Sequence, residues 1–255
     1  MISFSRAFSL LFVRALKQAT RPVAALLPSF FMPFFFFVVN SAGFRSVAQI
    51  PGFAEENYLS FYAPVALMMA VFFTSGEAGF EMMLDKSSGY FEKLLLAPIP
   101  RYAILLPRIA AMAVRAILQS TIMLLLLFVF GAPYRAGVVG TLLLFGLVAL
   151  FAMGWSGVGL TLATLMRSPR TLQSAFILTF PLTFITTAQM PLNLLSGWYK
   201  VAVLLNPITY ILEAIRSIMV TGLDLGKVTT GFAVALLLLL LTSTTAVLSF
   251  RKLAR

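Results

Sequence analysis

The sequence contains no cysteine and no histidine among its 255 residues. Disulfide bonds, thiolate nucleophiles, imidazole bases and ordinary zinc sites are therefore excluded, because they depend on these two side chains. Acidic residues are also scarce, with eight Asp and Glu in total. No carboxylates cluster within the apolar runs described below, so the sequence gives no support to an intramembrane enzyme.

Charged residues of all kinds make up 11% of the chain and hydrophobic residues 60%, against roughly 25% and 45 to 50% in average soluble domains. A soluble fold of this size could not bury that much apolar surface, so lipid must surround much of the chain. In lipid, only helices and closed barrels satisfy their backbone hydrogen bonds. The apolar runs are unbroken and about twenty residues long, which predicts an all-α polytopic membrane protein rather than a barrel.

Six apolar stretches are long enough to cross a bilayer as helices. The predicted transmembrane helices cover residues 23–42, 59–78, 103–130, 137–165, 172–190 and 231–250. The rest of the chain forms links and short helices, so we expect a single transmembrane domain over 1–255.

The 19 Lys and Arg are concentrated in the links on one side of these stretches, as membrane-orienting residues are. Five lie in links on the opposite side and Arg115 lies inside the third stretch, which leaves thirteen on the first side. Those thirteen are Arg6, Arg14, Lys17, Arg21, Lys86, Lys93, Arg101, Arg108, Arg167, Arg170, Arg251, Lys252 and Arg255. This asymmetry predicts cytoplasmic termini, and it makes the basic excess a membrane anchor rather than a nucleic-acid site.

Residues 1–21 are predicted to form an amphipathic helix along the cytoplasmic membrane surface. Arg14, Lys17 and Arg21 share one face at helical spacing, and the aromatic and leucine side chains lie largely elsewhere. A secretory signal peptide is not expected, because Arg14 and Lys17 end the apolar stretch early and no small-residue cleavage site follows.

The link over residues 79–101 is the longest one on the basic side, and it contains a short amphipathic helix. Ser87 or Ser88 can cap the start of this helix, and Pro98 disfavours helical geometry at the residue before it. Its apolar side holds Phe91, Leu94 and Leu95, and its polar side Glu92 and Lys93. Such a helix could fit a groove in a cytoplasmic partner. The alternative is a helix that rests on lipid headgroups.

The string from Gly89 to Arg101 resembles the cytoplasmic signature of the ABC-2 type permeases. The resemblance implies an exporter-like fold with a connecting helix and six transmembrane helices. It also implies that this segment is a coupling helix that docks on a nucleotide-binding subunit. The docking residues that it implies are Gly89, Tyr90, Phe91, Glu92, Lys93, Leu94, Leu95, Pro98 and Arg101.

A second resemblance to the same family lies before the last apolar stretch. Asn206, Pro207 and Tyr210 stand in its asparagine-proline-leucine-threonine-tyrosine motif, with Glu213 and Arg216 as the trailing acid and base. In the family this segment belongs to short re-entrant helices that close the pathway on the outside, here residues 191–226. Asn206 can cap a helix beginning at Pro207, and Glu213 and Arg216 are spaced to pair on it. The alternative is a cap on the bundle with no role in transport.

Charged residues near the membrane interior are expensive and are candidates for function. Glu77 and Glu81 lie four residues apart where the second span reaches the cytoplasm, and Arg108 and Arg115 share a face of the third. The spacing suggests an interhelical salt bridge, with Glu77 and Arg115 as the candidate pair. The alternative is that these side chains extend to the headgroups.

The chain has no phosphate-binding loop, because Gly226-Lys227 is followed by Val228 and lacks the glycine that such a loop requires. No cofactor is expected on this chain, and ATP and Mg are expected on a partner. The resemblance implies two ATPase subunits, a second identical or related permease chain, and a bacterial inner membrane. It implies export of hydrophobic or amphipathic cargo such as drugs, lipids or lipid-linked glycans. An ion-coupled secondary transporter and a noncatalytic membrane scaffold are the alternatives.

Overall fold

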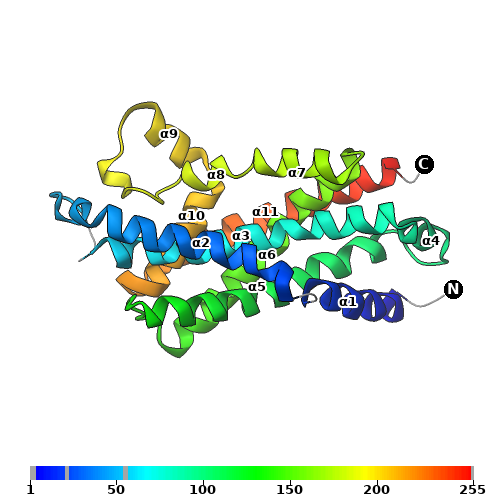
Figure 1. Ribbon diagram of the computed structural model, residues 1–255, viewed down its shortest axis with the longest axis horizontal. Helices are drawn as coiled ribbons and strands as arrows, with labels where there is room; N and C mark the ends of the chain where they lie inside the picture. The colour runs from blue at the N-terminus through cyan, green and yellow to red at the C-terminus, as the bar shows by residue number, and fades with distance from the viewer. Residues whose placement is uncertain (1–3, 21–22, 54–56, 254–255) are drawn as a thin grey trace.

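The computed structural model of the protein describes residues 4–20, 23–53 and 57–253, with the side chains of 19–28 and 251–253 left aside. The predictions on Arg21, Arg251, Lys252 and Arg255 fall on side chains outside that description. Over the described residues the chain is helical, and its long helices form an elongated bundle (Figure 1).

The first half of the chain contains α1 (Phe4–Thr20), α2 (Val23–Gly43), the 3₁₀ helix η1 (Arg45–Gln49), α3 (Tyr58–Ser87), α4 (Tyr90–Leu96) and α5 (Tyr102–Val129). The second half contains α6 (Gly137–Leu165), α7 (Pro169–Ile177), α8 (Pro181–Phe184), η2 (Leu192–Leu194), α9 (Gly197–Leu205), α10 (Pro207–Arg216), η3 (Ser217–Thr221) and α11 (Leu225–Leu253). The described residues form no strand.

Four described helices, α3, α5, α6 and α11, are long and apolar enough to cross a membrane. The pair α9 and α10–η3, bent by 82° at Asn206, makes a fifth candidate, and the described part of α2 that qualifies as apolar is the shorter segment Ser29–Gly43. Four to five candidate spans support a multi-pass membrane protein. The predicted number of six is not reached by these helices.

The stretch predicted as a fifth span, residues 172–190, is not one continuous helix. α7 ends at Ile177, α8 covers four residues from Pro181, and turns lead on to Gln189. Pro181 has no amide hydrogen to continue α7 and instead takes the first position of a new helix. The apolar run continues through this break, so its length alone predicts a single span there.

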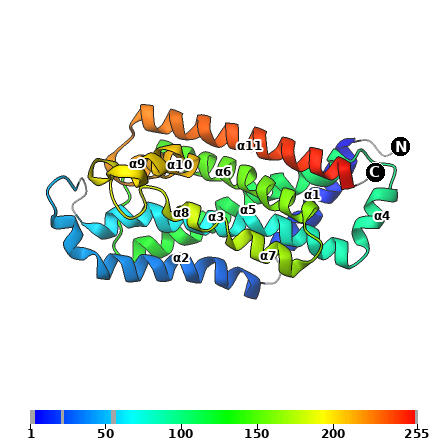
Figure 2. The same ribbon diagram turned by 90° about the horizontal axis from the view of Figure 1, so that it is seen from above.

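Helix α3 lies at the centre of the bundle. In its most apolar window 89% of the residues are buried, against 44% for α6 and 39% for α5. α2, α5 and α6 all pack against it. α1, α4 and the last turn of α11 lie at one end of the bundle, while η1 and α9 lie at the other, as Figures 1 and 2 show. We call these the α4 end and the α9 end.

Helices α3 and α6 approach closely where glycine faces glycine. A Cβ atom built on Gly79 would lie 2.3 Å from the carbonyl oxygen of Gly159, whereas one on Gly43 would meet nothing within 4 Å. Backbone atoms cannot yield as a flexible side chain can, so the two helices would have to separate.

We therefore expect Gly79→Ala to lower the free energy of unfolding by about 1 to 3 kcal/mol. Gly43→Ala is the matched control, since it adds the same methyl group to a helix in open space. Thermal unfolding of the two purified variants in the same detergent measures the difference. Equal midpoints for both variants would contradict close packing of α3 on α6.

Candidate functional site

Helix α4 begins with a sharp change of direction at Gly89. This residue is in the left-handed region, with φ of 71°, which favours glycine. Neither predicted serine caps α4, and that expectation is wrong: the Ser87 hydroxyl donates to the Leu84 carbonyl and the Ser88 hydroxyl to the Asp85 carbonyl. At the other end Ala97 is extended, with ψ of 143°, as expected before Pro98.

The apolar side of α4 packs on the bundle. Phe91 and Leu94 are buried, and the Phe91 ring lies edge-on to Phe250 of α11 with the ring centres 5.6 Å apart. Leu95 is half-buried. Phe91 and Leu94, two of the predicted docking residues, are therefore covered by this chain itself, whereas Glu92 and Lys93 of the same set are exposed.

The outward side of α4 consists of Glu92, Lys93 and Leu96, and we call it the α4 outer face. Glu92 and Lys93 are exposed, and Leu96 is 87% exposed. Pro98 and Arg101 are also exposed beside it. Leu96, the last residue of this short helix, follows the two charged residues by about one turn and buries little of its surface within this chain.

Three acids lie along one face of α3, because Glu77, Glu81 and Asp85 are each four residues apart. The helix continues through them for nine residues beyond the predicted end of the span at residue 78. Each acid has an arginine within reach, and this explains how a helix carrying three carboxylates packs inside the bundle. We call the three acids with Arg14, Arg108 and Arg115 the ion-pair cluster.

The part of the cluster that lies farther from α4 joins α3 to α5. Arg115 forms an ion pair with Glu77, and its other terminal nitrogen lies 3.5 Å from Glu81. The Arg115 side chain is 5% exposed. It therefore meets carboxylates within the protein and is not extended towards the surface.

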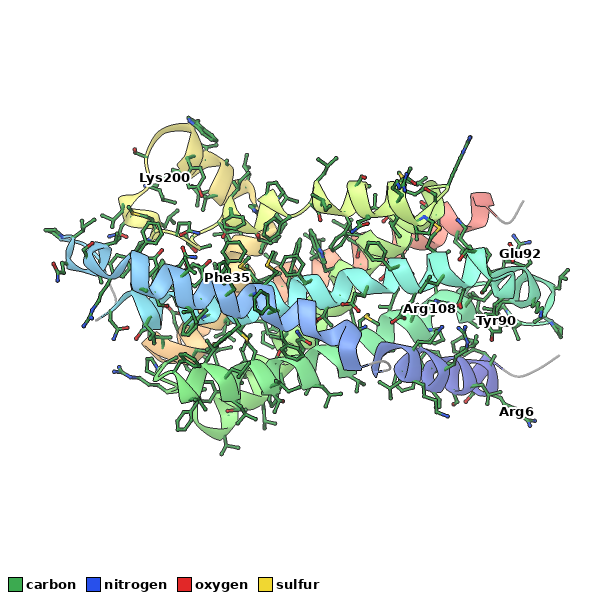
Figure 3. All side chains as sticks on the ribbon, viewed as in Figure 1. Arg6, Phe35, Tyr90, Glu92, Arg108 and Lys200 are labelled. Atoms are coloured by element: carbon green, nitrogen blue, oxygen red, sulfur yellow. The ribbon has the colours of Figure 1, made fainter. Side chains whose placement is uncertain are left out.

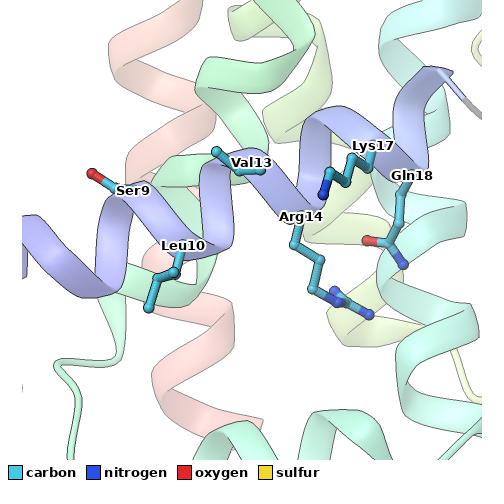
Figure 4. Close-up of a pocket in the computed structure, with 6 residues that line it drawn as sticks. All are labelled: Ser9, Leu10, Val13, Arg14, Lys17 and Gln18. Carbon is cyan, nitrogen blue, oxygen red and sulfur yellow. The ribbon is translucent and has the colours of Figure 1, made fainter.

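The part of the cluster that lies nearer to α4 centres on Asp85. Arg14 of α1 donates to both of its carboxylate oxygens, at 2.9 and 2.6 Å, and Arg108 of α5 forms an ion pair with it inside the bundle. Gln18 lies within 3.5 Å of the same carboxylate, and Figure 4 shows Arg14 and Gln18 directed to the same side of α1. One acid thus connects three helices.

Arg14 also connects the cluster to α4. Its guanidinium carbon lies 3.9 Å from the centre of the Tyr90 ring, a cation–π contact at the first residue of α4. Burial opposes the charge of Arg14, but the hydrogen bond and the charge of Asp85 outweigh it and raise the pKa of Arg14. Figure 3 labels Tyr90 and Arg108, which both lie towards the α4 end of the bundle.

Sequence reasoning missed Asp85 and Arg14. Asp85 follows Glu81 by four residues, so the helical spacing was available as a signal, but the expected end of the span at 78 placed it in a loop. Arg14 is 71 residues away from Asp85 in sequence. No local pattern links the two residues.

The α9 end is organised by Asn206. Its side-chain oxygen accepts from the Ile208 amide at 3.0 Å, and its amide nitrogen donates to the carbonyls of Leu182 and Ile185 at 2.7 and 2.6 Å. Pro207 takes the first position of α10. One side chain therefore caps α10 and fastens it to the broken segment around α8.

We expect Asn206→Ala to cost about 2 to 4 kcal/mol of stability, since it removes a helix cap and leaves two part-buried carbonyls without a donor. Asn193→Ala is the control. Asn193 is exposed and donates one hydrogen bond, to the Gly52 carbonyl at 2.7 Å. Chemical unfolding of both variants tests this, and equal losses would contradict the role given to Asn206.

Glu213 and Arg216 form an ion pair on α10, three residues apart. Arg216 is buried, donates to the Thr187 carbonyl at 2.9 Å, and stacks 4.1 Å from the ring centre of Phe61 in α3. Lys227 of α11 lies 3.9 Å from Glu213. The pair thus joins α10 to α3, to α11 and to the segment after α8.

Beside this pair lies an open cavity of 630 Å³. Tyr210, Glu213 and Arg216 line it together with residues of α9 and α11. Tyr210 also donates a hydrogen bond to the Leu204 carbonyl at 2.8 Å, which holds α9 against the start of α10. Three of the five residues predicted for this segment therefore line one cavity, while Asn206 and Pro207 lie outside its lining.

Comparison with known proteins shows how this chain is classified. The ABC-2 type transporter family matches residues 6–220, which include α4 and most of the cavity-lining segment. The chain belongs to the ABC-2 type transporter family. A family member of this kind is the membrane subunit of a transporter and is not itself catalytic, and membership implies a nucleotide-binding ATPase partner.

Individual relatives of this ABC-2 permease are distant. It is 27% identical over 208 residues to the putative transport permease ycf38 of Cyanophora paradoxa, covering 80% of this chain and 70% of the relative. It is 22% identical over 209 residues to the probable doxorubicin resistance ABC transporter permease protein DrrC of Mycobacterium tuberculosis, covering 82% and 75%. A further ycf38 protein, from Porphyra purpurea, is 25% identical over 240 residues, covering 89% and 82%.

Proposed function

We propose that this chain is the permease subunit of an ATP-driven exporter in a bacterial inner membrane, with both termini in the cytoplasm. Two copies, or this chain and a close relative, form the pathway, and two ATPase subunits bind on its cytoplasmic side. The cargo is hydrophobic or amphipathic. One observation carries the proposal: the α4 outer face is exposed, while Tyr90 at the start of α4 contacts Arg14 of the ion-pair cluster.

The contacts of α4 support a mechanical role for it. Tyr90 contacts Arg14, Arg14 binds Asp85, and Asp85 binds Arg108, so a displacement of α4 acts on α1, α3 and α5 together. The neighbouring Lys86 ammonium donates to the Ala163 carbonyl of α6 at 2.9 Å. The base of α4 is thus joined to four longer helices.

Helix α3 connects the two ends. Asp85 and Phe61 lie 24 residues apart on it, a distance of about 36 Å along a helix. At the α9 end Phe61 contacts Arg216. We propose that closure of the ATPase subunits pushes α4, and that α3 transmits this movement to the Glu213–Arg216 pair and shifts the bundle between its inward-facing and outward-facing states.

The experiment that tests this proposal uses the absence of native cysteine. Single cysteines at Glu92, Lys93 and Leu96 are treated in cells with a thiol-reactive photocrosslinker, and the captured proteins are identified. We expect an ATP-binding-cassette ATPase subunit at all three positions and little capture from the control Phe91→Cys, since Phe91 is buried. Capture of no ATPase from the three outer positions would overturn the assignment of α4.

A further inference from the structure

The cavity at the α9 end combines cationic and apolar lining. Lys200 of α9, Arg216 of α10 and Lys227 of α11 contribute three positive charges, and Glu213 contributes one negative charge, which leaves a formal charge of plus two. Asp224 is nearby in sequence, but its carboxylate accepts from the amides of Gly226 and Lys227 at the start of α11. The cavity therefore favours an anion.

The two lysines are available to bind it. Arg216 is buried and forms an ion pair with Glu213. The Lys227 ammonium lies 3.9 Å from the same carboxylate, and its side chain is 48% exposed. The side chain of Lys200, labelled in Figure 3, forms no ion pair or hydrogen bond with the residues that the structure describes. Both lysines therefore line the cavity, and the long contact of Lys227 with Glu213 is the one ion pair that either forms with the described residues.

The remaining lining is largely apolar and suits a hydrocarbon chain. Phe61, Pro191, Leu192 and Leu204 lie around the same space. Its volume of 630 Å³ is within the range of about 300 to 1,000 Å³ that is usual for sites of drug-sized ligands. A ligand with a charged head and an apolar tail would satisfy both kinds of lining.

We infer that this cavity binds an amphiphile with an anionic headgroup, with Lys200 and Lys227 on the head and the apolar residues along the tail. The inference rests on the proposed function, because it narrows the cargo of the pathway to a substrate class. The same cationic chemistry would attract a free phosphate ion, so the two ligands must be distinguished by experiment.

Binding to the purified full-length permease in an uncharged detergent tests the inference. The probes are lysophosphatidylglycerol, lysophosphatidylcholine of the same chain length and inorganic phosphate, each titrated calorimetrically. We expect the anionic lysolipid to bind at least about tenfold more tightly than the zwitterionic one. Tighter binding of longer tails is expected as well, since more methylene groups are buried.

The decisive variant is the double substitution K200Q/K227Q, which keeps side-chain size and removes both charges. It should weaken lysophosphatidylglycerol binding about tenfold and leave lysophosphatidylcholine unchanged. The matched control is K93Q at the α4 end, which removes an exposed lysine far from the cavity and should change neither. If the double variant does not purify as a single species, K200Q and K227Q alone should each weaken binding about threefold.

Three results would overturn the inference: equal affinity for the two lysolipids, unchanged binding in K200Q/K227Q, or displacement of the lysolipid by equimolar inorganic phosphate. None of these would affect the proposed function, which is tested separately by capture of an ATPase at α4. Conversely, failure of that capture would leave the binding measurement intact, because it uses the permease alone.

Discussion

Replacement of Asp85 by asparagine is expected to cost about 3 to 5 kcal/mol of stability. The side chain of Arg108 is 4% exposed and pairs with Asp85. Loss of the carboxylate charge would leave this arginine buried with no opposite charge in contact, a much larger penalty than the loss of a surface ion pair. Unfolding of D85N in detergent measures the cost.

Two further variants show whether the penalty has this origin. E92Q removes a carboxylate from the exposed outer face of α4, and we expect a change within about 0.5 kcal/mol. The double variant D85N/R108M removes the stranded charge and should recover much of the lost stability, because a methionine fills similar volume without it. Additive losses in the double variant would show that Asp85 and Arg108 act independently.

The long helices follow from sequence because their signal is local. The predicted spans 103–130 and 137–165 agree within a residue with α5 and α6, since an unbroken apolar run of this length has one stable form in lipid. α11 covers the predicted 231–250 and begins six residues earlier. The break within 172–190 could be predicted in part, because Pro181 lies in the middle of that stretch.

The candidate site depends on contacts that sequence patterns do not contain. The amphipathic pattern of α4 identified its apolar side correctly but could not show that Phe250, more than 150 residues later, covers Phe91. The spacing of Glu77 and Arg115 suggested their contact, which the structure contains. Helical spacing identifies faces of a helix, while the residues that meet there are determined by how the helices pack.

The ion-pair cluster also explains why α3 extends past its predicted end. Charges normally mark the end of an apolar span, and Glu77 was placed at such a boundary. In the structure each acid on this face has an arginine partner, so the helix continues to Ser87 with Asp85 buried. The cost of burying these charges is offset only when both partners are present, which no property of α3 alone could indicate.

Replacement of Leu96 by aspartate is expected to abolish coupled transport while leaving the bundle folded. Leu96 is 87% exposed at the tip of the α4 outer face, so its loss removes little buried area within this chain. Replacing a central leucine of a protein interface by aspartate removes its apolar contacts and buries a charge without a partner. Together these effects cost about 2 to 5 kcal/mol of binding free energy, or roughly 30-fold or more in affinity.

Proteoliposomes containing the permease and its ATPase subunits measure this effect as vanadate-sensitive, ATP-dependent movement of cargo. We expect L96D to lose at least 90% of that movement, since a 30-fold weaker interface leaves few complexes assembled at matched concentrations. L223D is the matched control: Leu223 is 43% exposed in the link between η3 and α11, outside the α4 outer face and the candidate spans. If L96D transports as well as the parent protein, and both variants unfold at the parent's midpoint, the ATPase must act on this permease elsewhere than at α4.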